Sequence, residues 1–115
     1  VAIVTTAGLG LRGEDAFGIG AADYKVIPLE TDSADILMTH ISVNFDRTGF
    51  QDDVNVVFPV DRLREMAADG GIGSVAGFHY SFMGATDPEQ LESSARALAE
   101  MMREDKVNAV LLSPV

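Results

Sequence analysis

Short apolar runs recur along the chain, separated by polar or glycine-rich stretches. Residues 1–7 (VAIVTTA) form a β-branched run without polar alternation, which is typical of a strand buried on both faces. Residues 109–112 (AVLL) have the same character and predict a buried final strand. Four more segments read as extended: residues 24–29, 35–42, 54–58 and the segment around 79–81. Pro28 makes the first of these an edge strand or marks its end.

Two stretches carry helix signals. Pro59 ends an apolar run, Asp61 then stands where an N-cap belongs, and Gly70-Gly71 closes the predicted helix. The second helix begins with Asp87 at the N-cap and Pro88 at the first helical position. The strand–helix–strand order predicts a single α/β domain over residues 1–115. We expect a mostly parallel sheet of about four or five strands, with helices on both faces.

Polar side chains stand at the ends of these buried-looking elements. Ligands bind open α/β sheets beyond the carboxyl ends of the strands, so such residues are site candidates. The candidates for substrate binding or for the edge of a site are Thr6, His40, Asn55, His79, Ser81 and Ser113. Structural roles remain open: His40 as a hydrogen-bonded structural residue, Asn55 as a strand-end amide, Ser113 as a turn before proline. Asp61 and Arg62 read better as a cap and a surface pair.

The segment Gly8–Gly13 matches the G-x-G-x-x-G spacing of a dinucleotide-binding turn, with Glu30 near the distance expected for a ribose-binding acid. That motif needs a helix that begins at its glycines. The residues between Gly13 and Tyr24 are too few and too rich in glycine for a crossover helix. A glycine-rich loop is therefore the preferred reading, and a nucleotide-binding domain is a weaker alternative.

The composition of the chain limits the classes of molecule that it could bind. The chain has 18 acidic and 8 basic residues and a net charge of -10, which disfavours nucleic acid and anionic membrane surfaces. No apolar run approaches the roughly 18–20 residues that span a bilayer. Cysteine is absent, which excludes disulfides, thiolate zinc sites and a cysteine nucleophile within these residues. With two histidines far apart in sequence, we expect no metal site and no cofactor within the chain. The absence of cysteine favours a reducing, cytoplasmic location.

Several blocks together resemble one protein family. They are VAIVTTAG at the N-terminus, residues 17–28, Thr39-His40, the D-x-N-V-V-F-P-x-D-R-L block at 53–63, Y-x-F-M-G at 80–84 and VLLS at 110–113. The chain is identified by them as similar, over essentially its whole length, to the selenoprotein B family of glycine, sarcosine and betaine reductases. The pattern is closest to the D-proline reductase subunit that contains selenocysteine.

The resemblance implies a reaction and a missing residue. In that family the strand matching residues 109–113 is followed by a selenocysteine or cysteine, with a second cysteine a few residues on. We therefore expect this chain to be the N-terminal part of a longer subunit, with the nucleophile immediately after Val115. A selenocysteine codon read as a stop would leave such a fragment, inactive alone.

The implied chemistry is reductive cleavage of a carbon–nitrogen bond in a small amino acid or amine. The resemblance also implies other reductase-complex subunits as partners, one of them carrying a pyruvoyl group. Family members often have a histidine after the glycine of the first strand, where this chain has Leu9-Gly10. If that histidine takes part in substrate handling, the departure implies a different amine substrate, or none. The alternative is a non-catalytic α/β module that binds a ligand or partner through His79 and Ser81. Exposed sheet edges further predict a homo-oligomer or pairing with another subunit.

Overall fold

The computed structural model describes residues 1–18, 22–39 and 48–115. His40 and the end of the predicted strand 35–42 lie outside the described residues. The main sheet has four strands in the order β3-β5-β1-β6. Its strands are β1 (Ala2–Thr5), β3 (Lys25–Pro28), β5 (Phe78–Ser81) and β6 (Val110–Ser113). β1 pairs in parallel with β5 and β6, whereas β3 pairs antiparallel with β5 at the edge. The mostly parallel α/β sheet and the edge position of the Pro28 strand are confirmed.

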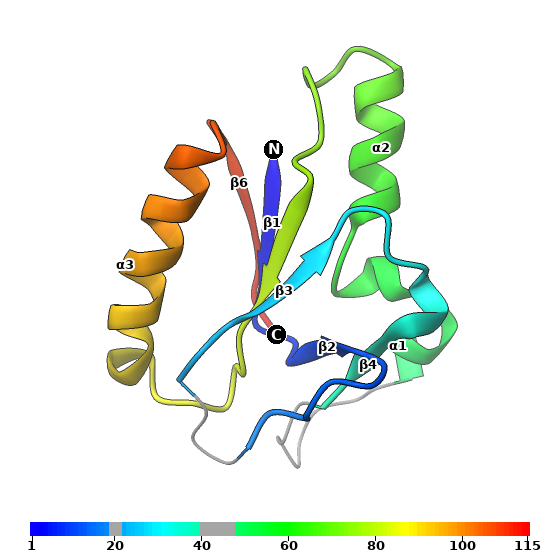
Figure 1. Ribbon diagram of the computed structural model, residues 1–115. Coiled ribbons are helices and arrows are strands. Elements are labelled where there is room, and N and C mark those ends of the chain that lie inside the picture. The colour runs from blue at the N-terminus through cyan, green and yellow to red at the C-terminus, as the bar shows by residue number, and fades with distance from the viewer. Residues whose placement is uncertain (19–21, 40–47) are drawn as a thin grey trace.

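Helices cover the two faces of this sheet (Figure 1). α3 (Pro88–Glu104) packs on one face, where Leu98 joins Tyr80 and Phe82 in a buried cluster. On the other face lie α1 (Thr48–Asp52), the 3-10 helix η2 (Val54–Val56) and α2 (Val60–Ala68). Neighbouring residues of β1 point to opposite faces, so Ile3 belongs to the α2-side cluster and Val4 packs against the α3-side cluster.

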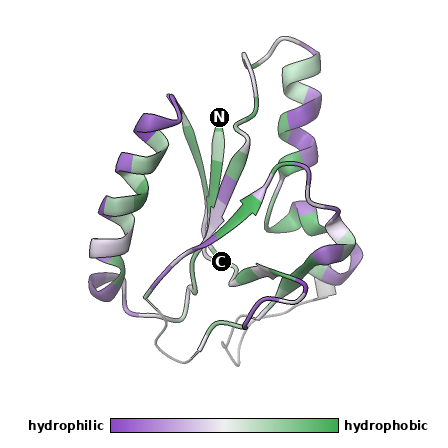
Figure 2. Ribbon diagram, viewed as in Figure 1, coloured by the Kyte–Doolittle hydropathy of each residue, from purple (hydrophilic) through white to green (hydrophobic). Residues whose placement is uncertain are grey.

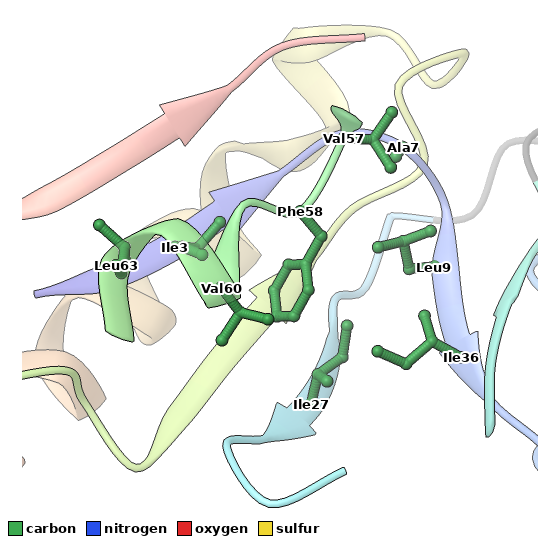
Figure 3. Packing of buried hydrophobic residues seen from close by; sticks show 9 residues of the cluster. All are labelled: Ile3, Ala7, Leu9, Ile27, Ile36, Val57, Phe58, Val60 and Leu63. Carbon is green, nitrogen blue, oxygen red and sulfur yellow. The ribbon is translucent and has the colours of Figure 1, made fainter. Parts of the chain in front are cut away.

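The α2-side cluster is the larger of the two described clusters (Figure 3). Phe58 lies within it beside residues from β1, β3 and α2, which tie the helix to the sheet. Its nine buried members are Ile3, Ala7, Leu9, Ile27, Ile36, Val57, Phe58, Val60 and Leu63. Figure 2 shows the hydrophobic colour concentrated on the strands, with α2 and α3 carrying both colours, as expected for amphipathic helices.

A second, two-stranded sheet lies below the carboxyl end of β1. β2 (Leu9–Leu11) pairs antiparallel with β4 (Ile36–Met38), which follows the 3-10 helix η1 (Ser33–Asp35). The predicted glycine-rich loop is therefore wrong in part, because its centre is a strand. Its ends are turns in which Gly8 and Gly13 take φ values of 69° and 91°, a region open mainly to glycine.

Residues 54–58 do not form the predicted extended run. The Asp53 carboxylate accepts the Asn55 N–H at 2.9 Å and starts η2 instead. This local side-chain bond competes with sheet pairing and overrides the β preference of the valines. The start of α2 also differs from prediction, since Pro59 holds the N-cap position and Asp61 lies in the first turn.

The start of α3 is confirmed. The Asp87 carboxylate accepts the Glu89 N–H at 3.0 Å, and Pro88 occupies the first helical position. The helix ends without glycine, because Lys106 itself takes the left-handed φ of 62°. No helix among the described residues is long and apolar enough to cross a membrane.

The last strand is not buried as predicted. β6 runs parallel to β1, but Val110, Leu111 and Leu112 are 40%, 39% and 69% exposed. Within the described residues β6 pairs only with β1, so its outer edge has no neighbouring strand.

Candidate functional site

The chain segments that follow β1 and β5 leave the sheet toward opposite faces. After β1 the chain enters β2, whose Leu9 packs in the α2-side cluster. After β5 it continues through Phe82, in the α3-side cluster, to α3. The chain runs from β1 to β5 on one side of β1 and then crosses to β6 on its other side, so the strand order reverses between β1 and β6. The carboxyl edge of these two strands is therefore the topological switch point, where ligands of open α/β sheets bind.

Backbone hydrogen bonds join the segment that follows β1 to the segment that follows β5. The Phe82 N–H donates to the Thr5 carbonyl at 2.8 Å, and the Gly84 N–H donates to the Thr6 carbonyl at 3.0 Å. In the reverse direction the Gly8 N–H donates to the Phe82 carbonyl at 2.9 Å. The backbone groups at this edge are therefore paired with one another by hydrogen bonds.

Ser81, the last residue of β5, lies in the core next to these paired groups. Its side chain is fully buried, and its hydroxyl accepts the Leu9 N–H at 2.8 Å. The hydroxyl thus provides the partner that the first residue of β2 needs inside the core, because a buried N–H without a partner is costly. Ser81 is near the predicted edge but is not accessible to a ligand.

The C-terminal segment, residues 113–115, lies along the same edge on the other side of β1. The Thr6 N–H and the Thr5 hydroxyl both donate to the Ser113 carbonyl, at 3.2 and 3.1 Å. The Ser113 hydroxyl donates to the Val57 carbonyl at 3.0 Å, which links the segment to the residue after η2. The Thr6 hydroxyl accepts the Val115 N–H at 2.8 Å.

Thr6 and Ser113 are thus the two candidates that the structure brings together. The three-way contact among β1, the turn after η2 and the C-terminal segment was not predicted. Thr5 and Val57 are part of it, and only the Thr5-Thr6 pair at a strand end gave a signal in the sequence.

Asn55 has a structural role at the start of α2. Its side-chain oxygen accepts the Asp61 N–H at 3.0 Å, a donor that the N-cap residue Pro59 has no side chain to satisfy. Its amide nitrogen donates to the Asp53 and Asp61 carboxylates, at 2.9 Å each. These bonds favour the charged form of Asp53, so the Asn55 side chain lowers the pKa of that carboxyl.

His79 does not join the carboxyl edge. It precedes the end of β5 by two residues and faces the core, where its ring lies nearly perpendicular to that of Phe58. Its Nδ1 accepts the Ile3 N–H at 2.9 Å, so the proton of the neutral ring is on Nε2. Nε2 is buried and has no hydrogen-bond partner among the described residues. Burial lowers the pKa of His79 to about 4, because desolvation disfavours the charged ring.

A hollow of about 360 Å³ lies elsewhere, between the turn after β3 and the beginning of α2. Its lining includes Glu30, Asp32, Asp61 and Arg64, and none of the six site candidates. Arg64 already pairs with Asp61 at 3.2 Å. Among the described residues no group of three or more His, Cys, Asp or Glu side chains is arranged to hold a metal ion.

Comparison with known proteins connects the chain to a family. The whole chain, residues 1–115, matches the family model described as glycine/sarcosine/betaine reductase selenoprotein B. It is 30% identical to the D-proline reductase subunit gamma of Acetoanaerobium sticklandii, over 98% of this chain and 47% of that protein.

Two further relatives belong to reductase complexes. The chain is 29% identical to the sarcosine reductase complex component B subunit beta of Peptoclostridium acidaminophilum. It is 27% identical to the glycine reductase complex component B subunit gamma of Carboxydothermus hydrogenoformans. Each match covers 98% of this chain and 27% of the relative, so the chain spans less than half the length of these proteins. No solved structure matches the chain.

Proposed function

Because the chain belongs to the glycine/sarcosine/betaine reductase selenoprotein B family, we propose that it forms part of a subunit that reductively cleaves a carbon–nitrogen bond. The substrate class is a small amino acid or amine. The names of three relatives, which are D-proline, sarcosine and glycine reductase subunits, support this class. The D-proline reductase subunit gamma is 30% identical to this chain.

The nucleophile in this proposal is a selenocysteine or cysteine that follows residue 115 in the full-length protein. The observation that carries the proposal is the position of Val115, bonded to the end of β1 at the carboxyl edge of the parallel strands. A residue that follows it begins its path at the topological switch point, where this fold binds ligands.

The described edge suits an anionic nucleophile. The side chains that hold residues 113–115 there are hydroxyls, from Thr5, Thr6 and Ser113, so none of them repels a selenolate or thiolate. A helix that begins after this segment would lower the pKa of the nucleophile further.

The reaction balances with a dithiol as the reductant. The nucleophile forms a bond to the α-carbon while the carbon–nitrogen electron pair leaves with the nitrogen, which takes a proton. One thiolate of the dithiol then attacks the selenium or sulfur, whose bond to carbon breaks, and the carbon takes a proton. The second thiolate attacks the first, which forms the disulfide and releases the selenolate or thiolate. A pyruvoyl group on a partner subunit would activate the amine. We assign no residue of this chain to it.

Other subunits of a reductase complex are the proposed partners. A second copy of the chain is a further proposed partner, supported by the exposed apolar residues of β6 and by its outer edge, which pairs with no strand of the described residues. The cytoplasm remains the proposed location.

The alternatives receive less support. His79 and Ser81 are both fully buried, so a module that binds through these two side chains is not favoured. Gly8–Gly13 contains β2 rather than the opening of a helix, so the turn that a dinucleotide needs is absent from these described residues.

The test uses the full-length protein, translated through its natural reading frame and assembled with its partner subunits. D-proline, glycine, sarcosine and betaine are offered with a dithiol, and cleavage product is measured against oxidised dithiol. We expect equimolar amounts for one of them. Alkylation should label a selenium or sulfur atom just beyond residue 115, and mass spectrometry should locate the label. Replacing the labelled residue with serine should abolish turnover. Turnover that survives this replacement contradicts the proposal.

A further inference from the structure

Thr6 occupies the point where regular pairing between β1 and β6 stops. The ladder is regular at both ends of β6: the Ala2 N–H donates to the Ala109 carbonyl at 3.1 Å, and the Thr6 N–H donates to the Ser113 carbonyl at 3.2 Å. In a parallel ladder the next bond would run from the Val115 N–H to the Thr6 carbonyl.

That bond is not formed, and the Thr6 carbonyl has a different partner. It accepts the Gly84 N–H, from the segment after β5 on the opposite side of β1. The Thr6 hydroxyl takes its place: it accepts the Val115 N–H at 2.8 Å and donates to the Val115 carbonyl at 3.4 Å. One side-chain hydroxyl thus contacts both backbone groups of one residue.

Packing adds to this contact. The Val115 side chain packs against the α2-side cluster, on the side where the Ser113 hydroxyl donates to the Val57 carbonyl. The Thr6 hydroxyl and this packing together hold residue 115 at the end of β1. Pro114, which is exposed and has no N–H, cannot form a competing ladder bond at the outer edge.

We infer that Thr6 is a positioning residue, whose hydroxyl takes the place of its own carbonyl as the partner of Val115 and holds that residue at the end of β1. This inference rests on the proposed function for its catalytic consequence, because the position of Val115 sets where a following nucleophile lies. The hydrogen bond itself does not depend on that function.

The first measurement is amide hydrogen exchange at Val115. The amide should be protected in the unaltered full-length protein, and Thr6→Val, which keeps the shape but removes the hydroxyl, should make it exchange about tenfold faster. Thr6→Ser keeps the hydroxyl and should restore protection. Thr39→Val is the matched control, because the Thr39 hydroxyl also donates to a backbone carbonyl, that of Gly8, and does not contact residues 113–115.

The second measurement is turnover by the assembled complex. Thr6→Val should lower kcat by about ten- to a hundredfold with KM nearly unchanged, because misplacing a nucleophile affects the reaction more than substrate binding. Thr6→Ser should recover most of kcat, and Thr39→Val should change neither constant.

The outcomes separate the two proposals. A Val115 amide that is unprotected in the unaltered protein, or that is as protected in Thr6→Val, overturns the role of Thr6, and the first result needs no variant to fold. Faster exchange with an unchanged kcat confirms the hydrogen bond but contradicts a reaction centre at this edge.

Discussion

β1 and β6 are neighbouring parallel strands of similar composition in opposite surroundings. β1 (AIVT) has helices over both faces, and Ile3 in its centre is fully buried. β6 (VLLS) carries equally apolar side chains, yet Leu112 is 69% exposed. The comparison teaches that an apolar run predicts how much side-chain surface a strand can bury. The position of the strand in the sheet decides how much of that surface is in fact buried. In β6 the two differ, which marks it as a surface suited to a covering partner.

The largest expected effect comes from a matched pair of truncations in the two strands. Ile3→Ala should lower the free energy of unfolding by about 2–5 kcal/mol, because it leaves a cavity in the α2-side cluster. Leu111→Ala, in the strand alongside at a residue that is 39% exposed, should cost about 1 kcal/mol or less. Urea unfolding of both variants measures the difference. Equal losses would show that β6 is already covered in solution.

The second effect is a loss of stability in acid that originates at His79, the buried partner of the Ile3 N–H in β1. The pKa of His79 is about 4 when folded and about 6.5 when unfolded, so the unfolded chain takes up the proton first. The stabilising contribution is complete above pH 6.5 and is lost as the pH falls toward 4, by about 2–3 kcal/mol. Unfolding measured between pH 7 and pH 4 gives the slope.

His79→Gln is the control for this titration. The glutamine side chain keeps an oxygen that can accept the Ile3 N–H but does not titrate, so the slope between pH 6.5 and about 5 should vanish, above the range in which Asp53 takes up its proton. A slope that persists in His79→Gln would assign the acid sensitivity to another group.

The third effect tests how α2 is attached beside the C-terminal segment. Asn55→Ala removes the acceptor for the Asp61 N–H and should cost about 1–2 kcal/mol. Asn55→Asp should cost more, because it sets a third carboxylate beside Asp53 and Asp61. Asn108→Ala, at an exposed position, is the control and should change stability little. Thermal unfolding compares the three, and a cost at Asn55 no larger than at Asn108 would contradict the capping role.

Local signals in the sequence predicted the elements that local chemistry controls. The β-branched run of β1, the Pro28 edge strand and the Asp87-Pro88 helix start were all readable, because each depends on residues within one turn or one strand. The helical turn η2 was missed, although its cause is also local: Asp53 captures the Asn55 N–H. Here a strong strand preference in three valines concealed a single capping bond.

Pairing between distant residues was not readable. The sequence placed Thr6 and Ser113 at strand ends, and the structure joins those ends. It gave no sign that Gly84 would occupy the Thr6 carbonyl, since that depends on which strands are neighbours. The side of β5 on which His79 lies depends on register in the same way, so the sequence placed His79 at the edge and the structure places it in the core.

The smallest expected effect on stability, and the most direct test of the contrast between β1 and β6, comes from Leu112. Leu112→Thr introduces a β-branched strand former at a residue that is already 69% exposed, so it should change the free energy of unfolding by less than about 0.5 kcal/mol. If a second copy or another subunit covers β6, the same change should weaken association measurably in light scattering, because the lost contact lies in the interface. Leu37→Thr, at an exposed residue of β4 in the small sheet, is the matched control and should leave association unchanged. Equal behaviour of the two variants would mean that the exposed face of β6 has no more affinity for a partner than any other exposed leucine.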